Sequence, residues 1–169
     1  MENMDYMINE MTAALQAMDP EILAGGILFT AGLFAAMMAY GVLRYLMTAI
    51  GYSKMYRKAG VAGWKAFIPV YNTYTNYKIA MSAKFFFLYA ALNILFAAIA
   101  NSTGIALQLA AAAAGIALIV VDVKRNVKMA KLFGKNAGTG IALIFFPGIT
   151  SLILGLGKTE YQGKIMEKN

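Results

Sequence analysis

The chain has 169 residues, of which 60% are hydrophobic and 14% are charged, and its mean hydropathy is +0.62. Soluble domains carry about 45–50% apolar and about 25% charged residues, so this composition excludes a disordered chain or a coiled coil and favours a membrane protein over a soluble domain. The sequence has no Cys and no His, which removes disulfides, thiolate metal sites and the commonest general base. We therefore expect no enzymatic activity, no cofactor and no metal site.

The N-terminal residues, 1–19, carry apolar side chains at helical spacing, which predicts an amphipathic helix. These apolar residues are Met4, Met7, Ile8, Met11, Leu15 and Met18. The polar face of the helix is acidic, unlike the Lys- and Arg-rich faces of helices that seek membrane surfaces. Three roles remain open: lying on the outer membrane surface, packing across the helix mouths or against a second copy, and simply solubilising the terminus.

Four apolar segments follow, at residues 22–49, 85–100, 104–121 and 140–157. A spanning helix needs about 20 residues, so we predict an all-α integral membrane protein with four transmembrane helices in a single membrane domain. Asp19, Pro20 and Glu21 suit the N-cap, the first helical position and an acid in the first turn of the first span. Only residues 101–103 separate the second and third spans, which predicts a tight antiparallel hairpin.

The fourth apolar segment is interrupted by Pro147 and Gly148. Proline removes a backbone donor and kinks or breaks a helix. The segment therefore either spans with a kink or turns back as a re-entrant hairpin. These alternatives place the C-terminal tail, residues 158–169, on opposite sides of the membrane.

Most of the basic charge lies in two stretches between the apolar segments, residues 50–84 and 122–139, whereas residues 1–21 contain acidic residues and no Lys or Arg. Cytoplasmic loops of membrane proteins carry an excess of Lys and Arg, so we expect both stretches to be cytoplasmic loops and the N-terminus to be extracytoplasmic. Contact with anionic lipid is the alternative use of this charge. We expect no binding to nucleic acid.

The first basic stretch interleaves aromatic and basic residues, which is typical of segments at a membrane–water interface. This pattern predicts an interfacial elbow or short helix. Gly60 and Gly63 are stop signals for the helix before it. The candidate interfacial and lipid-contacting residues of the two stretches are Lys54, Arg57, Lys58, Trp64, Lys65, Tyr71, Tyr74, Lys124 and Arg125.

Four polar residues, Arg44, Asn93, Gln108 and Asp122, lie within or at the end of apolar segments. Arg44 either snorkels to the cytoplasmic interface or lines a pore. Asn93 and Gln108 flank the hairpin at similar depth, where they either bond across its two helices or lie along a solute path. Asp122 is expected to pair with Arg125, Lys124 or Arg44, and a gating or relay role is its alternative.

Small residues dominate the third apolar segment and recur in the first. Because small residues let helix backbones approach closely, we expect the third helix to be central and the leftover small faces to form a homo-oligomer. The working hypothesis is a small self-associating membrane protein that forms an oligomeric channel or transporter-like pore. The alternative is a non-conducting scaffold or accessory subunit that docks a partner through the N-terminal helix or the aromatic loop.

Residues 63–74 read Gly-Trp-Lys-Ala-Phe-Ile-Pro-Val-Tyr-Asn-Thr-Tyr, and Phe-Gly-Lys and Leu-Gly-Leu-Gly motifs follow later in the chain. This pattern resembles an uncharacterised bacterial multi-pass membrane protein family, a domain of unknown function in which some members are labelled large exoprotein or signal-peptidase-related. The resemblance covers roughly residues 49–163, and Leu156 departs from it where an aromatic residue is expected. It implies a place in the bacterial cytoplasmic membrane and supplies no catalytic residue.

Overall fold

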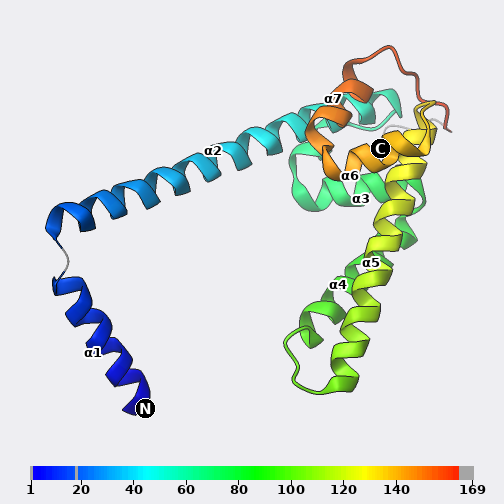
Figure 1. Cartoon of the computed structure of the whole chain (residues 1–169). Coiled ribbons are helices and arrows are strands. Elements are labelled where there is room, and N and C mark those ends of the chain that lie inside the picture. The colour runs from blue at the N-terminus through cyan, green and yellow to red at the C-terminus, as the bar shows by residue number, and fades with distance from the viewer. Residues whose placement is uncertain (1, 18, 164–169) are drawn as a thin grey trace. The chain divides into compact units, whose positions relative to one another are not determined.

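The computed structural model describes residues 2–17 and 19–163, which form seven α-helices and one 3-10 helix, with no strand in these two ranges (Figure 1). The predicted all-helical class is therefore confirmed. Two helices, α2 (Pro20–Lys58) and α5 (Ile105–Leu132), are long and apolar enough to cross a membrane. By contact the chain divides into two compact units, Met1–Leu43 and Arg44–Asn169.

The first unit contains α1 (Glu2–Ala17) and the N-terminal part of α2. The predicted N-terminal helix is thus present as α1, and its apolar residues Met4, Met7 and Met11 are exposed. The start of α2 also follows the sequence signals, because the Asp19 side chain accepts a hydrogen bond of 2.9 Å from the Glu21 backbone N–H. This bond satisfies one of the orphan donors of the first helical turn.

In the second unit, α2 remains helical through Lys58, although we expected residues 50–58 to belong to a loop. The physical reason is packing: Tyr52, Met55 and Tyr56 recur at helical spacing and are buried. The helix stops before Gly60, as expected, and Gly60 has a φ of 77° that favours glycine. The predicted elbow is a 3-10 helix, η1 (Gly63–Phe67), followed by α3 (Pro69–Ala80).

The predicted hairpin consists of α4 (Ala83–Ile99) and α5, which pack against each other (Figure 1). Ala111 and Ala114 of α5 are buried, and a Cβ on Gly115 would stand 3.5 Å from the Phe96 ring. Like α2, α5 continues beyond its apolar run, so residues 122–132, expected in a loop, are helical. Its extension buries Asn126 and Met129 on one face.

The fourth apolar segment is two short helices, α6 (Ala137–Phe145) and α7 (Pro147–Leu156), with the break at Phe146. Figure 1 shows α7 leaving the break in a direction sharply different from that of α6. At 1.5 Å per residue each helix is about 13–15 Å long, roughly half of a hydrocarbon core of about 30 Å. Neither helix alone has the length of a span.

The buried core of the second unit lies in an unexpected part of the sequence. Most of it comes from the continuation of α2 beyond Ala49, from α3 and from the continuation of α5, together with Leu143 of α6 and Leu154 of α7. In contrast, the most apolar 18-residue windows of α2 and α5 are 0% and 11% buried. The chain therefore buries the stretches that carry its basic charge and exposes its most apolar helices.

Two contacts hold α7 against the end of α2. The helices approach so closely that a Cβ on Gly51 would stand 2.6 Å from the Leu152 nitrogen. Beyond this crossing, the Lys58 ammonium donates hydrogen bonds of 2.8, 2.7 and 2.8 Å to the carbonyls of Leu154, Gly157 and Thr159. A cation at this position satisfies carbonyls that a helix C-terminus leaves unpaired.

Candidate functional site

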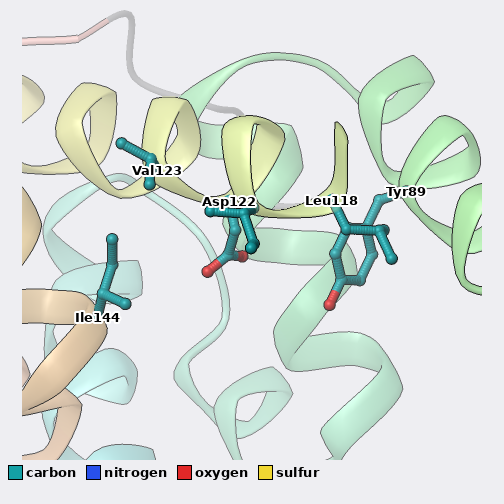
Figure 2. A pocket seen from close by; sticks show the side chains of 6 residues that line it. Tyr89, Leu118, Asp122, Val123 and Ile144 are labelled. Carbon is teal, nitrogen blue, oxygen red and sulfur yellow. The ribbon is translucent and has the colours of Figure 1, made fainter. Parts of the chain in front are cut away.

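A cleft of about 250 Å³ opens between α4, α5 and α6. Its lining residues are Tyr89, Leu118, Ile119, Asp122, Val123 and Ile144. Figure 2 shows the Asp122 carboxylate extending from α5 toward the space between Ile144 and Tyr89. The walls are mostly apolar, and the carboxylate is the one charged group among the lining residues.

Helix geometry explains how these residues meet. Leu118 and Asp122 are four residues apart on α5, so they lie on one face of that helix. The hairpin brings Tyr89 of α4 to the same place, and Ile144 comes from α6, which packs on α5. The α5–α6 approach depends on Gly140, because a Cβ there would stand 2.5 Å from the Val127 Cα.

The Asp122 carboxylate is held by its own helix. Its Oδ1 forms an ion pair of 2.8 Å with Arg125, which is one of the three partners we predicted. The Asn126 amide donates to the Asp122 backbone oxygen at 2.9 Å and, more weakly, to Oδ2 at 3.3 Å. Oδ2 can therefore accept another hydrogen bond. Because an ionised carboxylate has no proton to donate, its partner must be a donor, such as a hydroxyl or an ammonium group.

The Arg125 guanidinium lies over the Tyr77 ring, 5.0 Å from its centre, in a cation–π arrangement. The Tyr77 ring in turn stacks beside Tyr89, with the ring centres 5.1 Å apart. Burial raises the pKa of the Tyr77 phenol, and the nearby Arg125 charge opposes that rise only in part. Tyr77 is thus a neutral phenol that links the wall of the cleft to the buried core.

Two buried polar atoms beside this stack have no hydrogen-bond partner among the described residues: the Tyr77 hydroxyl and the Asn76 Oδ1. Their neighbour Asn72 is well bonded, since it accepts from the Asn76 amide at 3.2 Å and its carbonyl accepts from the Tyr56 hydroxyl at 2.9 Å. A buried polar group without a partner costs about 1–3 kcal/mol. The packing of α3 therefore includes this free-energy cost beside the cleft.

The described residues contain no cluster of acidic side chains able to hold a metal ion. What the arrangement offers instead is an open apolar groove with a carboxylate and a phenol at its polar side. Mostly apolar lining with a few polar groups is typical of sites that bind small molecules.

Residues 64–164 match a family of unknown function, DUF5684. The chain belongs to this family. The match includes every residue of the cleft and excludes α1 and α2. It confirms the expected relation to an uncharacterised family. No curated protein and no solved structure matches the chain.

The structure leaves the other polar residues of the apolar segments apart from this cleft. Arg44 is exposed. Asn93 donates to the Tyr89 carbonyl at 2.8 Å, and Gln108 donates to the Ser102 carbonyl at 3.3 Å. Each amide thus bonds a carbonyl near its own position in the chain, so the bond across the hairpin that we considered is not the one formed.

The candidate interfacial residues fall into two groups. Lys58 and Arg125 have structural partners, as described above, and Tyr74 packs edge-on against Phe86 with ring centres 5.4 Å apart. The other residues are exposed or partly exposed: Lys54, Arg57, Trp64, Lys65, Tyr71 and Lys124.

Sequence reasoning missed Tyr77, Tyr89 and Asn126 as parts of the site. Asn126 had a signal, since positions 122, 125 and 126 share one face of a helix, but we expected that stretch to be a loop. The two tyrosines carry no such signal, because their meeting with Arg125 depends on how α3, α4 and α5 pack.

Proposed function

We propose that this protein is a self-associating, channel- or transporter-like protein of the bacterial cytoplasmic membrane. Support for a membrane location comes from the exposure of the most apolar segments. A soluble protein would bury the 18-residue stretches of α2 and α5 that are only 0% and 11% buried here. In this proposal α2, α4 and α5 span the bilayer. The N-terminus is extracytoplasmic, and the basic stretches 50–84 and 122–139 are cytoplasmic.

The observation that carries the proposal concerns α6 and α7. The start of α6 packs at Gly140 against Val127, on the extension of α5 beyond its apolar run. The end of α7 is bonded by Lys58, on the extension of α2 beyond its apolar run. Both ends of the segment therefore lie beside the cytoplasmic ends of spans, which favours a re-entrant hairpin over a fourth span.

The turn of the hairpin is deeper than its ends. A Cβ on Gly148, next to the turn, would stand 3.3 Å from the Met47 side chain, and Met47 lies eleven residues before Lys58 on the same helix. At 1.5 Å per residue this is a descent of about 16 Å toward the apolar run. Broken helices at membrane depth occur where they are buried in protein or line a water-filled path, as in channels and transporters.

The cleft adds a polar group at the same place, since Ile144 of α6 and Asp122 of α5 both line it. An ionisable side chain beside a re-entrant segment marks an ion or solute path. We therefore assign the path to the α4–α5–α6 cleft, with Asp122 as the residue that contacts the moving ion or solute.

Flux through the reconstituted full-length protein tests this function. Liposomes with imposed K⁺, Na⁺ or H⁺ gradients, read by potential- and pH-sensitive dyes, should show flux that empty liposomes lack. Asp122→Asn should lower this flux at least about tenfold, as expected if about 1.4 kcal/mol of ion stabilisation is lost. Glu160→Gln, which removes an acid from the C-terminal tail, should leave the flux unchanged.

The alternative is a non-conducting scaffold or accessory subunit. The observation that favours it is the exposed methionine-rich face of α1, because methionine suits adaptable contact surfaces. An oligomeric particle that conducts none of the three ions would support the scaffold and remove the channel.

A further inference from the structure

We propose that the elbow formed by η1 and the start of α3 is an interfacial membrane anchor that selects anionic lipid headgroups. This inference rests on the membrane embedding proposed above and goes beyond the conducting or docking role. We define the elbow patch as the exposed surface of Trp64, Phe67, Ile68, Val70 and Tyr71.

The patch is unusually apolar for a surface. Its five side chains are between 42% and 68% exposed. Trp64 and Tyr71 lie together in the patch, with ring centres 5.5 Å apart. Tryptophan and tyrosine concentrate where a membrane meets water, because each has an apolar body and a polar tip.

The patch is also rigidly attached. Ala66 and Gly63 of η1 are buried, and Pro69 is the first residue of α3. Further along the helix, α3 buries Tyr77 and Ile79 in the core. The surface that remains outside is therefore held in place by packing beneath it and is not a loose loop.

One hydrogen bond gives the depth of the patch. The Tyr45 hydroxyl of α2 donates to the Phe67 carbonyl of η1. Tyr45 lies four residues before Ala49, where the apolar run of α2 ends. At 1.5 Å per residue, Tyr45 lies about 6 Å before the end of this apolar run, so the proposed embedding puts the patch near the boundary between headgroups and acyl chains.

Charge identifies the lipid class. Lys65 lies within η1, and the Arg57 Nε would be only 2.8 Å from a Cβ on Gly63, so both cations border Trp64. The described residues from Arg44 to Gly163 contain two acids, Asp122 and Glu160, and Asp122 is already paired with Arg125. An anionic headgroup is therefore the complementary partner of this surface.

Trp64 is the single tryptophan in the sequence, so its fluorescence reports on this patch alone when tyrosine is not excited. The full-length protein is reconstituted into phosphatidylcholine vesicles that contain a minor fraction of brominated phosphatidylglycerol or, in parallel, brominated phosphatidylcholine. Bromine placed near the headgroup should quench Trp64 more than bromine placed at the chain ends. Brominated phosphatidylglycerol should quench it more than the zwitterionic lipid does.

Charge variants then test the selectivity. Lys65→Gln and Arg57→Gln should each reduce the preference for phosphatidylglycerol about fivefold, the value that corresponds to about 1 kcal/mol per basic residue near a charged surface. Lys135→Gln removes the same charge between α5 and α6 and should leave the preference unchanged.

Three results would overturn the proposal. Strong quenching by aqueous acrylamide without quenching by bromolipid would mean that the patch faces water. Quenching by neither would mean that protein covers it, either a second copy or another partner. A protein that fails to co-float with vesicles would remove the membrane embedding as well as the anchor, whereas the first two results leave that embedding intact.

Discussion

Lys58 is the residue that most directly joins distant parts of the chain, because its ammonium bonds three carbonyls at and beyond the end of α7. Hydrogen bonds from a charged group contribute about 1.5–3 kcal/mol. We expect Lys58→Met to lower the unfolding free energy by about this amount, since the carbonyls lose their donor. Thermal unfolding in detergent measures it, and Lys54→Met, one turn earlier and exposed, is the control. Equal effects of the two variants would contradict the cap.

Two glycines of the second unit, Gly51 and Gly115, are expected to respond differently to substitution by alanine. A Cβ on Gly51 would stand 2.5 Å from the Ser151 carbonyl carbon, whereas one on Gly115 would make an ordinary contact of 3.5 Å with Phe96. Gly51→Ala should therefore destabilise the protein by about 1–3 kcal/mol through overpacking. Gly115→Ala should be neutral or stabilising, because alanine in a helix interior is more favourable than glycine by about 1 kcal/mol. A thermal shift assay on both variants distinguishes these outcomes, and a harmless Gly51→Ala would show that the α2–α7 crossing is loose.

At the scale of elements, the two continuations of α2 and α5 show what sequence patterns reveal and what they hide. Apolar runs located α2, α4, α5 and the α6–α7 segment, and the signals at Asp19 and Gly60 located two helix ends. Residues 50–58 and 122–132 were expected to be loops because they carry charge and polar groups. Each nevertheless places its buried residues at helical spacing, as Asn126, Met129 and Ala130 do. A search for amphipathic period beyond the end of an apolar run would have found both.

The proposed re-entrant hairpin of α6 and α7 predicts which side of the membrane the C-terminal tail occupies. The chain has no cysteine, so single cysteines can be introduced at Asn3, Lys128 and Glu160 and labelled in intact cells with an impermeant reagent. We expect labelling at Asn3 only, because a hairpin returns the tail to the side of Lys128. Labelling at Glu160 as well as Asn3 would mean that the segment spans. Labelling at Lys128 would overturn the orientation of the whole chain.

The contacts around Asp122 include some that sequence patterns cannot predict. The sequence offered Arg125, Lys124 and Arg44 as possible partners of Asp122, and the structure pairs it with Arg125. The stacking of Arg125 on Tyr77, and of Tyr77 beside Tyr89, depends on the packing of three helices. The sequence contains these residues without any local sign that they meet.

At the scale of the whole molecule, small residues on α5 distinguish packing within one chain from packing between copies. Ala114 is buried against neighbours of its own chain, whereas Ala113 is exposed. Four glycines of α2, at positions 25, 26, 32 and 41, likewise have no neighbour of the first unit within 4 Å of where a Cβ would stand. Alanine and glycine gain little from lipid but permit close helix contacts, so a second copy is the expected occupant of these faces.

Ala114→Leu and Ala113→Leu separate the two kinds of contact. Ala114→Leu should cost about 1–3 kcal/mol by overpacking within one chain, visible as a lower Tm in detergent. Ala113→Leu should leave that Tm unchanged and reduce the mass of the particle in native nanodiscs, because the added side chain keeps two helices of different copies apart. Cyclic symmetry would close such interfaces without leaving an open face. A wild-type monomer across a range of protein-to-lipid ratios would refute the assembly, and an unchanged particle mass for Ala113→Leu would move the interface away from this face of α5.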